Sequence, residues 1–220
     1  MSLPKLVRMC LGQTHDTWFA DDHARQKYGS LVRTNPLKLE RKFPKLRRGN
    51  GGSFSATYML EDGNILKASR CSDEAYQEFL RLAIKRQSNP FYPKVFAVGF
   101  YFKRQMVVME KLTRLTKTHK DLGLSIALHS TLSCVNPSPF LYPLIGTKRE
   151  MPPEEALRKL FFNRAVRHGY MAHKQAFRQL VEDLVPLAKK YNYDLHQDNV
   201  MVRPHAHSEG GQLVVIDPVC

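Results

Sequence analysis

The sequence predicts an α+β protein whose first part is rich in strands and whose second part is mainly helical. Three observations carry this prediction. Short apolar runs separated by turn residues recur between residues 55 and 109, as in antiparallel strands joined by tight turns. Apolar residues three and four positions apart continue over residues 173–191, which is the spacing of a long helix. Two further apolar runs, 200–202 and 213–216, then predict a closing pair of strands.

The composition is that of a folded globular chain with a strong basic excess. The chain has 220 residues, of which 43% are hydrophobic and 25% charged, and a formal charge of +14. This excess favours a polyanionic partner such as a nucleotide or an acidic protein; nucleic acid stays an alternative, although no recognition motif accompanies the charge. The four cysteines lack C-x-x-C spacing, and no apolar run is long enough for a signal peptide or a membrane span. We therefore expect free thiols, no membrane partner and a cytoplasmic location.

Residues 1–48 predict a basic extension ahead of the first strand. Helix signals are weak there, and Pro36 and Pro44 interrupt any long element. Lysine and arginine crowd the end of the extension, from Lys38 to Arg48. These side chains suit an acidic partner, although a solvated face is the simpler interpretation. After the extension we expect a first lobe over residues 49–112 and a second over residues 113–220.

A glycine-rich turn opens the first lobe. Residues 49–58 predict a strand with this turn near its start, and residues 61–64 predict a tight turn into a second strand, 65–68. Glycines between two strands let backbone N–H groups approach phosphate oxygens. Lys67, an amine within the second strand, is the cation expected at those phosphates. The residues expected to contact a nucleotide at the turn are Gly49, Gly51, Gly52, Ser53, Phe54 and Ser55.

A helix over residues 73–86 is expected to hold Lys67 in place. Ser72 or Asp73 is its expected N-cap. Glu74 and Glu78 lie four residues apart on one face of the helix, so either is able to pair with Lys67. We prefer Glu78, while an exposed helix carboxylate is the alternative for both.

Two strands and a linker complete the first lobe. Residues 95–100 and 105–109 predict the strands, and residues 110–112 lead into the second lobe. A linker between lobes can present its backbone groups to an adenine edge. Glu110 and Leu112 are therefore candidates for nucleotide contact by position alone.

The last quarter of the chain carries the strongest chemical signal. The long helix leads into Asp194, which is followed by Asn199, an apolar strand, a turn over residues 203–212 and a second strand ending in Asp217. A hairpin of these strands would bring Asn199 and Asp217 to one end. The arrangement predicts phosphotransfer from ATP, with Asp194 as the base and Asn199 and Asp217 as magnesium ligands. Asp198 is an additional ligand candidate, and within the second lobe we expect loops around a short helix over residues 122–132 and a further helix over residues 154–167.

The order of these parts resembles the protein-kinase-like superfamily over residues 49–220. Three sequence motifs resemble those of the early serine/threonine protein kinases of T-seven-type short-tailed bacteriophages. They are G-x-F-S-A-x-Y from Gly52, D-x-H-x-x-N from Asp194, and D-P-V from Asp217. The resemblance implies a two-lobed protein-kinase-like fold with a β-rich N-lobe. Because the chain stops at Cys220, it implies a reduced helical C-lobe. It also implies a magnesium-dependent kinase acting on serine or threonine of host proteins, with Lys67 at the α and β phosphates.

Two departures keep other functions open. His196 replaces the usual lysine of the catalytic loop, as in aminoglycoside and choline kinases, which leaves a small-molecule kinase as an alternative. Asn192 and Tyr193 stand where most protein kinases have His-Arg. A chain ending soon after Asp217 also suits a kinase-like module that binds and inhibits a host enzyme. The complete set of base, lysine and metal ligands favours the enzyme.

Overall fold

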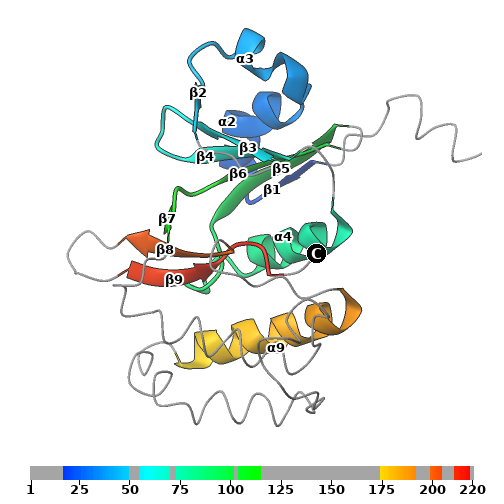
Figure 1. The fold of residues 1–220 in the computed structure, drawn as a ribbon, viewed down its shortest axis with the longest axis vertical. Helices are drawn as coiled ribbons and strands as arrows, with labels where there is room; N and C mark the ends of the chain where they lie inside the picture. The colour runs from blue at the N-terminus through cyan, green and yellow to red at the C-terminus, as the bar shows by residue number, and fades with distance from the viewer. Residues whose placement is uncertain are drawn as a thin grey trace, which may run out of the picture. The chain divides into compact units, whose positions relative to one another are not determined.

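The chain has a mixed α+β fold, as predicted, with one large antiparallel sheet, a small second sheet and a few helices (Figure 1). It divides into two compact units. Unit 1 comprises residues 1–72 and 94–111, and unit 2 comprises residues 73–93 and 112–220. The computed structural model describes residues 17–49, 55–69, 73–101, 104–114, 174–191, 199–204 and 211–218.

Unit 1 is built on a six-stranded sheet with the order β1-β5-β6-β4-β3-β2. All its neighbouring strands pair antiparallel. The structure confirms the predicted strands between residues 55 and 109, each with small shifts at its ends. The strands are β1 (Thr17–Phe19), β2 (Arg47–Arg48), β3 (Ser55–Met59), β4 (Ile65–Ser69), β5 (Val95–Tyr101) and β6 (Arg104–Met109).

The N-terminal region is part of this sheet, so the prediction of an extension ahead of the first strand is wrong for residues 17–48. Strand β1 pairs with β5, and helix α2 (Asp22–Val32) follows it. The N-cap Asp21 accepts a hydrogen bond from the amide of Ala24 at 2.7 Å. After α2 come the 3-10 turn η1 (Pro36–Lys38) and the short helix α3 (Leu39–Lys42). Charged residues between the apolar ones weakened the helix signal in the sequence.

One face of the sheet packs against these N-terminal helices. Figure 1 shows α2 and α3 on the same side of the sheet. On β3, β4 and β6 the even-numbered residues face the helices, because side chains alternate between the two faces; on β5 the residues paired with them, Ala97 and Gly99, do so. The odd-numbered residues of β4, Lys67 among them, therefore stand on the opposite face. The buried cluster between sheet and helices comprises Ala24, Tyr28, Leu31, Val32, Leu39, Tyr58, Leu66, Ala68, Ala97, Met106 and Val108.

Helix α2 approaches β5 so closely that the strand requires a glycine at the contact. A Cβ atom at Gly99 would lie 2.2 Å from the carbonyl oxygen of Val32, which is far inside van der Waals contact. The carbonyl belongs to the backbone and cannot rotate away. Gly99 therefore allows the end of α2 to rest directly on the sheet.

A carboxylate fastens the β3–β4 turn to α2. The predicted turn is present, and Gly63 adopts a φ of +83° within it. Asp62 accepts hydrogen bonds from the hydroxyl of Tyr28 and from the ammonium of Lys27, the latter at 2.7 Å. The side-chain amide of Asn64 donates to the Tyr28 hydroxyl at 2.9 Å. Burial alone would raise the pKa of Asp62, but the bonds from Lys27, Tyr28 and Asn64 together lower it.

The described residues of unit 2 form two helices and a three-stranded sheet. Helix α4 starts after Asp73, whose side chain accepts from the amides of Ala75 and Tyr76 at 2.8 and 3.4 Å, so the predicted cap is confirmed. Helix α9 confirms the predicted long helix and continues through Pro186. The elements are α4 (Glu74–Lys85), α9 (Lys174–Lys190), β7 (Thr113–Arg114), β8 (Val200–Pro204) and β9 (Gly211–Val215), with the sheet order β7-β8-β9.

Asp183 on α9 ties the two helices of unit 2 together. Its carboxylate accepts from Nε and Nη2 of Arg86 at 2.9 and 3.0 Å, from the hydroxyl of Tyr92 at 3.0 Å and from Nε2 of Gln179 at 3.1 Å. Burial, and then the charge of Asp183, raise the pKa of Tyr92. These bonds join α4 to a helix much later in the sequence. We expected α4 to belong with the first lobe, yet it groups with unit 2.

Apolar side chains line one buried face of α9. The expected face of α9 is buried, with Phe177, Leu180, Leu184 and Leu187 inside.

The predicted helices at 122–132 and 154–167 lie outside the described residues. Within the described part of the chain, none of the helices has the length and apolar character needed to cross a membrane.

Candidate functional site

The β8–β9 hairpin brings Asn199 and Asp217 to one end of a strand pair, as the sequence predicts. Val200 pairs with Val215, and the amide of Ile216 donates to the carbonyl of Asn199 at 2.9 Å. Asp217 is the next residue. The strands also pair at Arg203 with Gln212 and at Pro204 with Gly211, so they extend into the segment that we assigned to the turn.

The hairpin is held rigidly within unit 2. Its strand residues Val200, Val202, Leu213, Val214 and Val215 are buried. The amide of Val215 donates to the carbonyl of Phe91 at 3.0 Å. The guanidinium of Arg203 donates to the carbonyls of Pro90 and Tyr92 at 2.8 and 3.0 Å. Asn199 and Asp217 therefore extend from a fixed support, as a metal site requires.

The chemistry of this pair suits magnesium bound together with a phosphate ligand. Magnesium prefers oxygen ligands and is usually held by one or two carboxylates, substrate phosphates and water, without a full protein cage. Asn199 supplies an amide oxygen and Asp217 a carboxylate. Among the residues that the structure describes, no group of three or more His, Cys, Asp or Glu side chains is placed to hold a metal ion by itself. The predicted base Asp194, with His196 and Asp198, lies outside those residues.

Lys67 lies in the middle of unit 1's sheet. On β4 it is paired with Thr57 of β3 on one side and Val107 of β6 on the other. Its neighbours Leu66 and Ala68 are buried under the N-terminal helices, which directs Lys67 to the other face. The ammonium is thus presented by a strand that is bonded on both sides.

The pairing of β3 with β4 confirms the predicted strand, tight turn and strand, while β2, which the sequence did not predict, pairs with β3 on the other side of the glycine-rich turn. Arg48 pairs with Tyr58, and the amide of Gly49 donates to the carbonyl of Thr57 at 2.8 Å. Ser55 pairs with Ser69, which places the start of β3 two residues along β4 from Lys67. The glycine-rich turn lies outside the described residues, and so do its residues Gly51, Gly52, Ser53 and Phe54.

Glu78 has a partner that we did not predict. Its carboxylate accepts from the ammonium of Lys190 at 2.5 Å, within unit 2. This bond is the main cause that lowers the pKa of Glu78 and raises the pKa of Lys190. Lys67, the partner expected from the sequence, belongs to unit 1. Glu74 is exposed in the first turn of α4.

The linker residues Glu110 and Leu112 lie at the division between the units. Glu110 closes unit 1, where its amide donates to the carbonyl of Lys94 at 2.9 Å and its carboxylate accepts from the amide of Lys94 at 2.8 Å. Leu112 is buried in unit 2. The sequence did not predict the strand that follows: Thr113 and Arg114 form β7, which pairs with β8.

Neither a protein-family model nor a curated protein sequence matches this chain.

Proposed function

We propose that the protein is an ATP- and magnesium-dependent phosphotransferase with a two-lobed protein-kinase-like fold, which modifies serine or threonine of host proteins. The observation that carries the proposal is the paired end of β8 and β9, which sets Asn199 beside the residue preceding Asp217. An amide and a carboxylate fixed in this way are the protein's share of a magnesium–nucleotide site. The central strand position of Lys67 adds a cation suited to phosphate oxygens.

Each residue has a defined part in the proposed reaction. ATP would supply the phosphoryl group, and magnesium would neutralise the charge on its phosphates. Lys67 orients the α and β phosphates, while Asn199 and Asp217 hold the metal. Asp194 accepts the proton of the substrate hydroxyl as its oxygen bonds to the γ phosphorus. The bond between that phosphorus and the β–γ bridging oxygen breaks, and ADP leaves with the electron pair.

A transfer assay with labelled ATP tests the proposal. The protein is incubated with γ-labelled ATP, magnesium and a host lysate, beside Asp194→Ala and Lys67→Met. Loss of a general base typically costs about 10²–10⁴-fold in rate, so both variants should lose nearly all label transfer to protein. Lys85→Met is the matched control, because it removes an exposed ammonium from the last turn of α4 and should transfer normally.

The same assay separates the two alternatives. Label on a low-mass alcohol, with none on protein, would indicate a small-molecule kinase. Transfer that is absent from every preparation, while the protein still inhibits a host enzyme, would indicate the binding module.

Nucleotide titration tests the metal ligands separately from catalysis. Magnesium should strengthen ATP binding, and Asp217→Asn should abolish that magnesium-dependent gain while leaving metal-free binding unchanged. Asp22→Asn serves as the control, because Asp22 is exposed on α2 and pairs only with Arg25. Equal affinity with and without magnesium in the unmodified protein would remove Asn199 and Asp217 from the site.

A further inference from the structure

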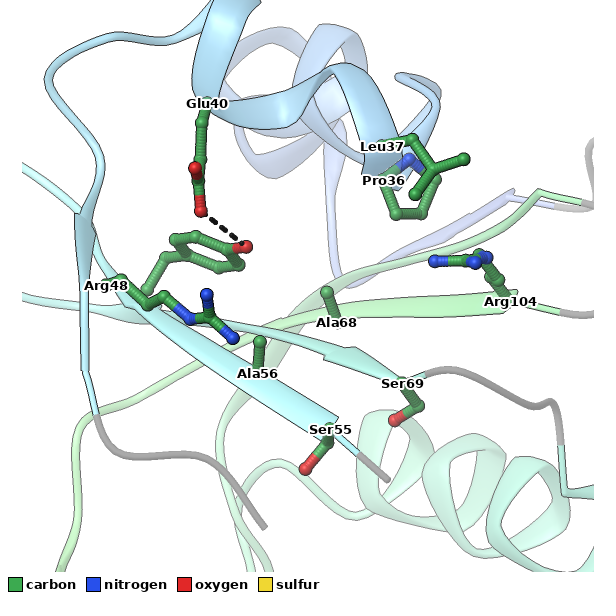
Figure 2. Close-up of a pocket in the computed structure, with 10 residues that line it drawn as sticks. Pro36, Leu37, Glu40, Arg48, Ser55, Ala56, Ala68, Ser69 and Arg104 are labelled. Carbon is green, nitrogen blue, oxygen red and sulfur yellow. Dashed lines mark hydrogen bonds between the residues drawn. The ribbon is translucent and has the colours of Figure 1, made fainter. Parts of the chain in front are cut away.

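Unit 1 contains a cavity on the face of its sheet opposite Lys67. The cavity measures about 330 Å³ and lies between the sheet and the η1–α3 segment (Figure 2). Ala56 and Ala68 form its floor, and both belong to the helix-covered face, as the alternation of side chains requires. Lys67 stands between Leu66 and Ala68 and points the other way. The floor of the cavity therefore lies on the face opposite Lys67, while Ser55, one of the residues expected at the nucleotide, lines its edge.

Two guanidinium groups enter this cavity from opposite ends. Figure 2 shows Arg48 reaching in from β2 and Arg104 from β6, below Pro36 and Leu37. The register agrees, because Arg48 pairs with Tyr58, whose side chain belongs to the helix-covered cluster, and Arg104 lies two residues before Met106 of that cluster. Both arginines thus stand on the same face of the sheet.

The arginines have no carboxylate partner among the described residues. The one acidic side chain that lines the cavity is Glu40, and its Oε1 accepts a hydrogen bond from the Tyr58 hydroxyl at 3.2 Å. Neither guanidinium is within ion-pair distance of a carboxylate in the described part of the chain. A guanidinium at each end gives the cavity a positive charge, so a ligand with acidic groups would be favoured.

An apolar side chain stands at the edge of the cavity. Leu37 is 75% exposed and is the only large hydrophobic residue so exposed in the described ranges. It lies beside the basic stretch from Lys38 to Arg48. A ligand that fits both features carries negative charge next to an apolar group. A free phosphate or other small anion would leave Leu37 uncovered.

From these features we propose that the cavity binds an acidic segment of a partner protein. Acidic side chains of the segment meet Arg48 and Arg104 at the two ends of the cavity, and a neighbouring apolar side chain covers Leu37. Ligand pockets usually measure about 300–1,000 Å³, so this one encloses one or two side chains while the rest of the segment crosses the basic surface. Single-stranded nucleic acid fits less well, because it binds through exposed aromatic rings, and Tyr58, the one aromatic residue among the described residues that line the cavity, is buried.

Binding of a model peptide tests this site without nucleotide, so the outcome does not depend on phosphotransfer. The probe is a dye-labelled peptide of alternating glutamate and leucine, followed by fluorescence anisotropy with the full chain. A charged hydrogen-bond partner is worth about tenfold in affinity, so Arg48→Gln with Arg104→Gln should weaken binding by about 100-fold. Leu37→Ser should weaken binding by about threefold. Because Leu37 is exposed, this variant should fold normally.

Arg41→Gln is the matched control. Arg41 is exposed on the neighbouring α3 and does not line the cavity. Its substitution therefore removes the same charge from the surface and leaves the cavity unchanged. It should weaken binding by less than about threefold. A glutamine–leucine peptide, inorganic phosphate and oligothymidine are run beside the acidic peptide and should each bind more weakly.

Three results would overturn the proposal. The first is an equal loss of affinity in Arg41→Gln and Arg104→Gln, which would mean that only the net charge matters. The second is tighter binding of oligothymidine through the same arginines, which would assign the cavity to nucleic acid. The third is failure of the acidic peptide to bind the unmodified protein, or binding that is unchanged in Leu37→Ser and in the arginine variants.

Discussion

In each unit a partly buried carboxylate ties a helix to a distant segment, but Asp62 and Asp183 lie in different surroundings. In unit 1, Asp62 binds an exposed turn to α2, and its side chain is 20% exposed to solvent. In unit 2, Asp183 lies between α4 and α9, and its side chain keeps 11%. Water can replace the partners of Asp62 more easily than those of Asp183. The same kind of bond is therefore peripheral in unit 1 and central in unit 2.

Apolar packing has the larger part in unit 1, and polar bonds have the larger part in unit 2. Unit 1 rests on the packing of α2 and α3 on a continuous sheet face, with the close approach of Val32 and Gly99 at its edge. Unit 2 brings together elements far apart in the sequence, and polar bonds fix their positions. We therefore expect unit 1 to be most sensitive to changes of shape and unit 2 to the loss of a polar partner.

The largest effect is expected from Asp183→Ala. The variant leaves the buried hydroxyl of Tyr92 without its acceptor and should lower the free energy of unfolding by about 2–3 kcal/mol. Hydrogen exchange should accelerate in α4 and α9 and stay unchanged in β3 to β6. Mass spectrometry of exchanged peptides measures both. Glu182→Ala is the control, because Glu182 is exposed and pairs only with Arg178 one turn away; equal acceleration in the two variants would contradict the central role of Asp183.

Gly99→Ala tests the shape-dependent packing of unit 1. The added Cβ meets the backbone carbonyl of Val32, so α2 must move, and overpacking of this kind costs about 1–3 kcal/mol. Exchange should accelerate in α2 and β5 and stay unchanged in α9. Gly29→Ala is the matched control in the same unit, since its Cβ would have no neighbour closer than 3.8 Å and alanine favours a helix. A Gly99→Ala protein as stable as the control would disprove the close contact.

The fold was largely readable where the local pattern agrees with the final packing. The Asp73 cap, the apolar stripe of α9 and the Gly63 turn are local signals, and the structure confirms each of them. Strand β1 was missed because three residues give no alternation to detect, and only pairing with β5 makes them a strand. Its position at the sheet edge is decided by residues nearly eighty positions later.

The candidate site was predictable to the extent that it follows from one hairpin. Asn199 and Asp217 meet because adjacent strands pair antiparallel, which a sequence can indicate. The partner of Glu78 was not predictable in this way. Lys190 lies at the far end of α9, and helix spacing alone cannot show which distant cation reaches a given carboxylate. Likewise, Arg104 joins Arg48 through the order of the strands in the sheet.

A smaller effect, dependent on pH, is expected from Asp62→Asn. The folded pKa of Asp62 is lowered, so its contribution to stability is complete above its ordinary value of 3.8 and is lost as the pH falls through the folded value. At pH 7 the variant should be less stable by about 1 kcal/mol, allowing for solvent screening. The difference should shrink as the pH is lowered below 3.8. Urea titrations at several pH values measure it, with Glu61→Gln, an exposed neighbour on the same turn, as the control; a difference that does not depend on pH would point to packing alone.

The smallest effect on stability is expected from Lys190→Met, and this variant also bears on catalysis. The pKa of Glu78 is lowered and that of Lys190 raised, so the pair stabilises unit 2 above the ordinary glutamate value of 4.5 and below the ordinary lysine value of 10.5. Because both side chains reach water, the melting temperature at pH 7 should fall by only about 1 °C, and high salt should remove the difference. Lys189→Met, which removes an exposed ammonium from the next position, should leave the melting temperature unchanged.

Phosphotransfer then tests whether Glu78 has a part in catalysis beyond its bond to Lys190. If Glu78 serves only Lys190, Glu78→Gln and Lys190→Met should lower the melting temperature equally and leave label transfer intact. If Glu78 also positions Lys67 during transfer, Glu78→Gln should reduce label transfer while Lys190→Met preserves it or raises it, because the carboxylate is released. Equal loss of transfer in both variants would exclude either account and would mean that the ion pair itself supports the catalytic arrangement.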